Sequence, residues 1–244
     1  MQPAPPEHTR GGAMFPVEGN RWILTLQGYS RDYPPADEAG FLEFVRSLRT
    51  PRIYDAVKDA EPLSPISVYR ATENRLRHYE RLPRTLGRFV AVGDAACAFN
   101  PVFAQGMTMA ALAAMTLDEA LREQRRRRSG LKGFSRVFRK KLAKVNAVPW
   151  MLATSEDLRA RGCEGECPGR VTLLMQKYVD NVVRLSTHSP KARKPLLEVF
   201  NLLKPPSALF HPSIPLQMLA QHFKRTDKLE SRTSQHDKLE DTAF

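Results

Sequence analysis

The residues best suited to chemistry lie in one stretch, between positions 88 and 114. Gly93 and Asp94 follow a short apolar run, RFVAV, and the loop 101–106 leads into a long segment rich in Ala, Met and Leu. A glycine lets a ligand approach the backbone closely, and an aspartate accepts hydrogen bonds from sugar-like hydroxyls. A loop that enters a helix presents unpaired amides, which favour a phosphate or a heterocyclic carbonyl. The stretch therefore predicts a ligand site.

A strand, a loop and a helix are needed to hold these residues. The apolar run 88–92 has the length of a buried strand and stops at Gly93, while the segment from Gly106 to about 124 has the composition of a buried helix. We therefore expect Asp94 at the carboxyl end of a strand, beside an exposed loop. The residues expected to be buried around it are Val92, Ala95, Met109, Ala110 and Ala113.

This stretch resembles the second FAD motif of the FAD-dependent aromatic-ring hydroxylases and the related squalene epoxidase and geranylgeranyl reductase flavoproteins. That motif runs roughly GDAAHxxxPxxGQGMN. The matching positions, all in register, are Gly93, Asp94, Ala95, Ala96, Pro101, Gln105, Gly106 and Met107. A match at this many positions is far more specific than a lone pair of glycines. Flanking segments also look like this family, so the resemblance covers most of residues 12–222.

The resemblance implies a cofactor site for FAD. Asp94 would bind the ribityl hydroxyls, and the backbone around Gly106, Met107 and Thr108 would face the pyrimidine edge of the isoalloxazine. The cofactor-binding residues implied in this way are Gly93, Asp94, Pro101, Gln105, Gly106, Met107 and Thr108. No metal site is expected.

The activity implied by the resemblance is that of an FAD-dependent monooxygenase. NAD(P)H would serve as co-substrate that reduces the flavin, and O₂ would then hydroxylate or epoxidise an apolar or aromatic small molecule. Protein groups in such a site chiefly position the flavin and exclude water, so no catalytic side chain is singled out.

The chain also departs from the family pattern. Cys97 stands in place of the usual histidine, and Ala104 stands where a glycine is common. If the loop requires a positive φ at Ala104, flavin binding is weakened. No GxG and no Asp-Gly pair occurs in the 244 residues, although the family holds the FAD pyrophosphate with a GxGxxG unit. We therefore expect a C-terminal portion that binds FAD poorly and is inactive alone.

The expected fold class is α+β or α/β, as a partial FAD-binding, glutathione-reductase-like Rossmann fold with a mostly helical C-terminal half. Residues 1–80 would hold the end of a substrate-domain sheet and its connecting helices. Residues 81–125 would hold the end of the FAD-binding domain, 126–224 a helical region, and 225–244 a disordered charged tail.

Periodicity and turn residues set the elements expected elsewhere. Residues 1–20 carry turn residues and no sustained period, so no regular element is expected there. The expected elements are a strand over 21–29 that Gly28 ends or bulges, a helix over 41–48, a shorter helix after Pro51, one or two strands over 66–79, and helices over 131–161 and 170–203.

The positive charge of +12 is concentrated in residues 122–144, which hold eleven Lys or Arg and one acid. This run could bind anionic lipid or nucleic acid, or it could be a solvated helix face. Its large apolar residues recur at helical spacing, which favours the solvated face and predicts no nucleic-acid partner. The apolar residues expected to face inward are Phe134, Val137, Phe138 and Leu142.

The apolar runs and the number of cysteines indicate the compartment in which the protein is expected. No apolar run of about 18 residues and no signal-peptide core occurs, and three cysteines are too few for a disulfide framework. We therefore expect a cytoplasmic protein, with peripheral membrane contact through the proline-broken apolar segment 195–223 as an alternative to core packing. A structural zinc site needs about four ligands, and no second Cys or His pair follows Cys163 and Cys167 at ligand spacing. We therefore interpret both as ordinary loop cysteines. The rival function is a non-catalytic remnant that acts as an interaction or membrane-surface module.

Overall fold

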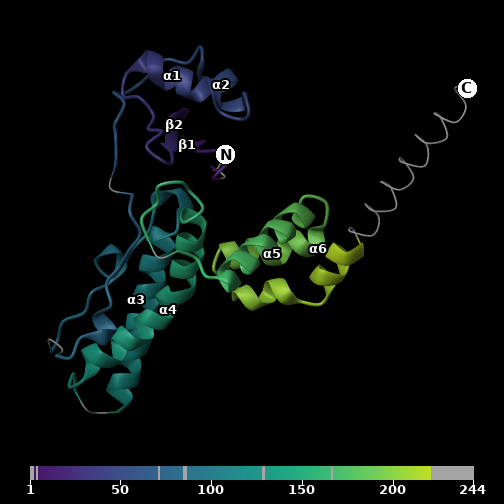
Figure 1. Ribbon diagram of the computed structural model, residues 1–244. Helices are drawn as coiled ribbons and strands as arrows, with labels where there is room; N and C mark the ends of the chain where they lie inside the picture. The colour runs from purple at the N-terminus through teal and green to yellow at the C-terminus, as the bar shows by residue number, and fades with distance from the viewer. Residues whose placement is uncertain are drawn as a thin grey trace, which may run out of the picture. The chain divides into compact units, whose positions relative to one another are not determined.

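The computed structural model describes residues 3, 5–70, 72–84, 87–127, 130–165 and 167–220. The chain divides into two compact units, 1–167 and 168–244. Helices and two small antiparallel sheets of two strands each form the regular structure of the described residues, an α+β composition. Figure 1 shows the helices of both units. The coarse fold class expected from the sequence is therefore confirmed, whereas the described sheets contain no parallel strand pair.

The first unit begins with an antiparallel hairpin of β1 (Arg10–Val17) and β2 (Arg21–Gly28). The turn between them places Gly19 at φ +76° and Asn20 at φ +52°. The strand expected over 21–29 is confirmed, including its end at Gly28, but the expectation of no element in residues 1–20 is wrong. The sequence of β1 is RGGAMFPV, and its two glycines and its proline are unfavourable in strands. The strand forms because it pairs with β2.

Two short helices, α1 (Glu38–Arg46) and α2 (Arg52–Val57), follow the hairpin as the sequence predicted. Asp37 caps α1 because its side chain accepts a hydrogen bond from the backbone N–H of Gly40 at 2.8 Å. The local core consists of Phe44, Val45 and Leu48 of the α1 region, against which Leu24, Leu26, Phe41, Ile53, Tyr54 and Val57 pack.

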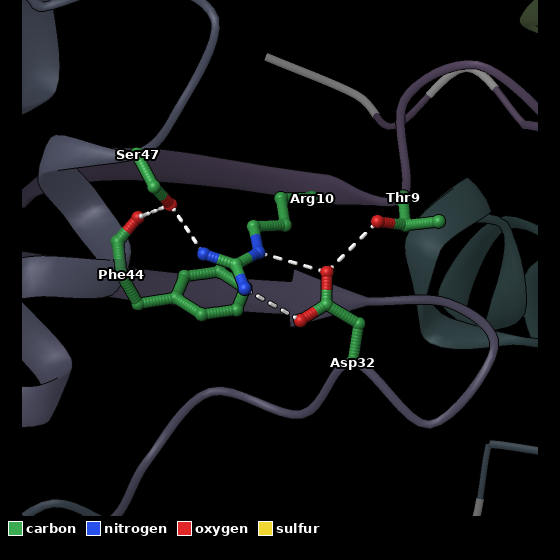
Figure 2. A network of polar contacts seen from close by, with 5 residues as sticks. All are labelled: Thr9, Arg10, Asp32, Phe44 and Ser47. Atoms are coloured by element: carbon green, nitrogen blue, oxygen red, sulfur yellow. Dashed lines mark hydrogen bonds and ion pairs between the residues drawn. The ribbon is translucent and has the colours of Figure 1, made fainter.

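A polar network ties the start of β1 to the loop after β2 and to α1 (Figure 2). Arg10 forms two hydrogen bonds with the carboxylate of Asp32, each at 2.8 Å, and Thr9 Oγ1 donates to the same carboxylate. The Arg10 guanidinium also lies 4.6 Å from the ring centroid of Phe44 and donates to Ser47 Oγ at 2.6 Å. Arg10 thus joins the hairpin to α1 by charge, hydrogen bonds and cation–π contact.

The segment between α2 and the candidate site contains little regular structure. Of the strands expected over 66–79, only β3 (Arg75–Leu76) forms, followed by the 3₁₀ helix η1 (Tyr79–Arg81). β3 pairs with β4 (Cys97–Ala98) in antiparallel register. The longer strand prediction is wrong because most of these residues are exposed and have no neighbouring strand among the described residues.

The strand expected over 88–92 does not form either. Val92 has extended angles, φ −136° and ψ 165°, but it is 41% exposed and belongs to no ladder. A strand of the buried type needs neighbours on both edges for its N–H and C=O groups, and the described residues supply none. Burial was predicted correctly for Met109 and Ala113 and wrongly for Val92, Ala95 and Ala110.

Two long helices complete the first unit, α3 (Gly106–Arg126) and α4 (Phe134–Asp157), which lie side by side (Figure 1). Lys141 of α4 pairs with Glu123 of α3 at 2.6 Å. The predictions of a helix from Gly106 and of a helix within 131–161 are confirmed. The buried residues of their shared core are Ala91, Ala96, Ala113, Ala120, Phe134, Phe138 and Leu142.

The basic run 122–144 spans the end of α3 and the first half of α4. Phe134, Phe138 and Leu142 face inward as predicted, and Val137 is half-buried. Most of the basic residues of the run that the structure describes are exposed, as a solvated face requires, but Arg139 is 6% exposed and lies in the interior. Burial of one cation in such a run is not visible from periodicity alone.

The second unit contains α5 (Arg170–Ser186), α6 (Pro190–Phe200) and the 3₁₀ helix η4 (Pro206–Phe210), and residues 213–220 are helical. This confirms the helices expected over 170–203. The predicted charged tail 225–244 lies outside the described residues. Within the described chain, no helix is both long and apolar enough to cross a bilayer. The core of this unit is formed by Val182, Leu185, Ala192, Leu196, Val199, Leu209 and Ile214.

Candidate functional site

Gly93 and Asp94 lie in a short 3₁₀ turn, η2 (Gly93–Ala95), next to the start of α3. Gly93 has φ +56°, a left-handed conformation that glycine adopts without steric cost. The Asp94 carboxylate lies beside the first residue of α3, because a Cβ added to Gly106 would be 3.9 Å from Asp94 Oδ1. The structure therefore brings together three of the seven predicted residues, Gly93, Asp94 and Gly106.

The loop between Asp94 and α3 contains the 3₁₀ helix η3 (Pro101–Phe103). Asn100 caps η3, since its side chain accepts a hydrogen bond from Val102 N at 3.2 Å. Ala104 then adopts φ 52° and ψ 27°, so the loop does require a left-handed residue at the position where the family commonly has glycine. This conformation directs the chain through Gln105 into α3.

The N-terminus of α3 has no side-chain cap. Its first N–H groups are therefore available to a ligand acceptor, as in other helix N-terminal sites. Met107 is 88% exposed and Thr108 is exposed, so both lie at the surface of the first turn. The other four predicted residues, Pro101, Gln105, Met107 and Thr108, lie on this loop and in the first turn of α3.

A buried polar cluster behind the loop was not anticipated from the sequence. Asp157, at the end of α4, accepts hydrogen bonds from Tyr29 Oη at 2.6 Å and from Asn100 Nδ2 at 3.1 and 3.2 Å. Asn74 Nδ2 also donates to Asp157, and the Asn74 side-chain oxygen accepts from Asn100 N at 2.8 Å. The cluster holds Asn100, and hence the start of η3, from three distant segments.

Tyr29 is a donor in this cluster. Burial raises the pKa of Tyr29 well above its usual range, and the hydrogen bond to Asp157 raises it further. The phenol therefore stays protonated and donates a hydrogen bond to the Asp157 carboxylate. The sequence offered no signal for the cluster, since its four members are polar residues scattered along the chain.

Cys97 lies beside Asp94 but is poorly suited to act as a nucleophile. Burial raises the pKa of the Cys97 thiol to about 12, and the negative charge of Asp94 adds to the effect. Cys97 is therefore a protonated, buried thiol at neutral pH and serves as a packing residue. Cys163 and Cys167 are exposed and free, and the described residues contain no group of three or more metal-ligating side chains.

No family model matches the chain. The chain is similar to protein Rv3254 of Mycobacterium tuberculosis (strain ATCC 25618 / H37Rv), with 28% identity over 211 residues. The aligned region covers 86% of this chain and 44% of that relative, so the chain spans less than half the length of the curated relative it matches.

Proposed function

We propose that this chain is the C-terminal portion of an FAD-dependent oxidoreductase of the monooxygenase type. The observation that carries the proposal is the placement of the Asp94 carboxylate beside Gly106 at the uncapped start of α3. Gly93 and Gly106 flank this carboxylate, and both belong to the eight-position match with the family motif. The curated relative is more than twice as long as the region it shares, which is in keeping with a larger protein.

The residues present fit the ribityl and pyrimidine part of FAD. Asp94 is exposed and accepts no hydrogen bond from the described residues, so both its oxygens can accept from ribityl hydroxyls. Among the described residues other than its chain neighbours, only Ala110 Cβ, at 3.9 Å, lies within 4 Å of the position that a Cβ on Gly93 would occupy. This open space and the free first turn of α3 leave the backbone accessible to a flat ring. A pyrophosphate-binding GxGxxG unit would come from another segment, because the sequence contains none.

FAD would supply the redox chemistry, taking electrons from NAD(P)H and reacting with O₂ so that an apolar or aromatic substrate is oxygenated. The residues of this chain would bind and orient. Asp94 would fix the ribityl chain, and the N–H groups of the first α3 turn would favour the electron-rich pyrimidine edge. The cluster around Asp157 would hold the connecting loop in place.

The unpaired run before Gly93 supports the proposed partial FAD-binding fold. Val92 is extended, and Val92 and Phe89 are 41% and 50% exposed although both are large apolar residues. Exposed large apolar side chains without a neighbouring strand among the described residues are expected where further strands of a sheet would pair. In the complete flavoprotein this run would become a strand of the parallel sheet.

The test is flavin binding followed by fluorescence. The purified chain alone is expected to show no binding of FAD in the micromolar range. In a longer or reconstituted form that holds FAD, Asp94→Ala is expected to weaken binding by about ten- to a hundredfold, since it removes charge-assisted hydrogen bonds of about 1.5 to 3 kcal/mol each. The control is Arg126→Ala with Arg127→Ala, two exposed cations at the end of α3, which should leave affinity unchanged. An unchanged affinity of the Asp94→Ala form would refute the proposed role.

A second candidate function, a membrane-surface module, is favoured by one observation in the second unit. Val171 and Leu174 of α5 are 74% and 61% exposed, and Leu203 is 75% exposed next to Lys204. Apolar side chains beside basic ones suit the interface of an anionic bilayer. Flotation with vesicles containing phosphatidylserine tests this candidate: Val171→Asp with Leu174→Asp should abolish any binding, and absence of binding by the native chain would exclude it.

A further inference from the structure

Arg139 of α4 is a buried cation, with 6% of its surface exposed. A buried charge is costly unless an opposite charge or a full set of hydrogen bonds compensates it. In the part of the chain that the structure describes, Arg139 forms no ion pair with a carboxylate. Its charge therefore has no counter-ion among the described residues.

The hydrogen bonds of the guanidinium are also incomplete. Nε donates to the carbonyl oxygen of Ser135 at 3.0 Å, and Nη1 donates to the carbonyl oxygen of Tyr79 at 3.3 Å. Nη2 is buried and has no hydrogen-bond partner. Because Nε bonds to a residue one turn earlier, the guanidinium lies along the first turns of α4.

A second polar atom without a partner lies in those turns. Ser135 is 3% exposed, and its hydroxyl makes no hydrogen bond. The same turn is the N-terminal end of a helix of 24 residues, and its N-cap, Gly133, supplies no side-chain hydrogen bond. The helix dipole adds partial positive charge there. The first turns of α4 thus hold a buried guanidinium nitrogen and a buried hydroxyl that have no negatively charged partner among the described residues.

The acidic residues on neighbouring elements already have other partners. Glu80 of η1, next to Tyr79, bonds to His78 Nδ1 at 2.7 Å and lies 3.5 Å from Arg81. Glu123 at the end of α3 pairs with Lys141 at 2.6 Å. Glu119 of α3 lies 3.7 Å from Lys141 as well. Among the described residues none of these three carboxylates neutralises Arg139, so a bound anion could supply the compensating charge.

We propose that the first turns of α4 bind an oxyanion of the phosphate type through Arg139 Nη2 and Ser135 Oγ. A tetrahedral oxyanion accepts hydrogen bonds from a guanidinium and a hydroxyl at once, and a helix N-terminus favours its charge. A cation or a neutral apolar ligand would leave the buried charge uncompensated. The site is independent of the flavin function proposed above, since it shares no residue with it.

The phosphate can be free or part of a larger molecule, and titrations with two ligands distinguish these sources. Isothermal titration of the full chain uses inorganic phosphate in one arm and ADP in the other, at constant ionic strength set with chloride. Saturable binding of inorganic phosphate at least as tight as that of ADP identifies the free anion. Tighter binding of ADP identifies a phosphate carried on a nucleotide.

Two variants and a matched control locate the site. Arg139→Met and Ser135→Ala should each weaken phosphate binding by about tenfold or more, because each removes a hydrogen bond to a charged group. Arg136→Met removes one positive charge from an exposed position in the same helix, and its phosphate affinity should stay within about twofold of the native value. Equal losses in all three variants would mean that only the general positive charge matters, which would overturn the proposal.

Thermal unfolding gives an independent readout. Phosphate should raise the Tm of the native chain and leave that of Arg139→Met unchanged, while without phosphate the Arg139→Met chain should be at least as stable as the native one. If Arg139→Met does not fold, Ser135→Ala decides the matter, because loss of a hydroxyl preserves packing. Absence of phosphate binding to the native chain beyond the chloride control, or native affinity in Ser135→Ala, would refute the site.

Discussion

Asn100 and Asp157 lie 57 residues apart in the sequence, yet Asn100 Nδ2 donates to both carboxylate oxygens of Asp157, at 3.2 and 3.1 Å. Asn100 begins the loop of the candidate cofactor site, and Asp157 ends α4. Tyr29, just after the hairpin, donates to the same carboxylate at 2.6 Å. One buried side chain therefore joins the hairpin, the candidate loop and the long helix pair.

Replacing Asp157 with asparagine should destabilise the first unit strongly. The new amide nitrogen would be a donor facing the donors of Tyr29, Asn74 and Asn100, so at least one buried hydrogen bond would be lost. We expect the free energy of unfolding to fall by about 2 to 4 kcal/mol, measured by urea denaturation.

The matched control for Asp157→Asn is Asp118→Asn. Asp118 is 60% exposed and pairs with Arg122 on the surface of α3. Its replacement should change the free energy of unfolding by no more than about 0.5 kcal/mol. Equal effects of the two substitutions would show that the buried cluster contributes nothing beyond surface charge.

Ala104→Gly should stabilise the chain. Ala104 has φ 52°, a left-handed conformation that costs a residue with a Cβ about 1 to 2 kcal/mol, whereas the extra freedom of glycine in the unfolded state costs about 0.4 to 1 kcal/mol. The net gain expected in urea denaturation is about 0.5 to 1 kcal/mol. Ala110→Gly, at an exposed position inside α3, should instead destabilise by about 1 kcal/mol. The same sign for both substitutions would contradict the strain at Ala104.

Gly28→Ala should be poorly tolerated. A Cβ at Gly28 would lie 1.8 Å from the carbonyl oxygen of Asp32, a backbone atom that cannot rotate away. The turn after β2 would have to shift, and with it the Arg10–Asp32 pair. We expect a loss of at least about 2 kcal/mol in thermal or urea unfolding. At Gly87, where a Cβ would meet nothing within 4 Å, the same change should be nearly neutral.

The Arg10–Asp32 pair should make stability depend on pH at the acid end. The hydrogen bond from Arg10 holds the pKa of Asp32 below its usual value, with a further hydrogen bond from Thr9. A depressed folded-state pKa stabilises the fold fully above the unfolded pKa of about 3.9, and this stabilisation is lost as the pH falls through the folded pKa.

Comparison of the native chain with Asp32→Asn measures this dependence. Because the Arg10 side chain is 39% exposed, solvent screening limits the expected difference at neutral pH to about 1 kcal/mol. Urea denaturation at several pH values should show a constant difference above about pH 5 that vanishes at the lowest pH. A difference that persists unchanged to the lowest pH would show that the contribution is not electrostatic.

The sequence by itself determined the helices and the candidate motif. The periodicity of residues 41–48 and 131–161 predicted α1 and α4, and the motif placed the start of α3 at Gly106. A helix forms its hydrogen bonds between residues four apart, so a local stretch contains nearly all the information needed. Asp94 and Gly106 are close along the chain, which is why their proximity was also foreseeable.

Only the tertiary structure decided which extended segments become strands and which polar residues meet. β1 forms because β2 lies beside it, whereas 88–92 stays unpaired because no described strand is its neighbour. The meeting of Asn100 with Asp157 and the burial of Arg139 likewise depend on contacts between distant segments. Pairing, burial and charge compensation are properties of what surrounds a residue in space, and no local pattern of residue types specifies those surroundings.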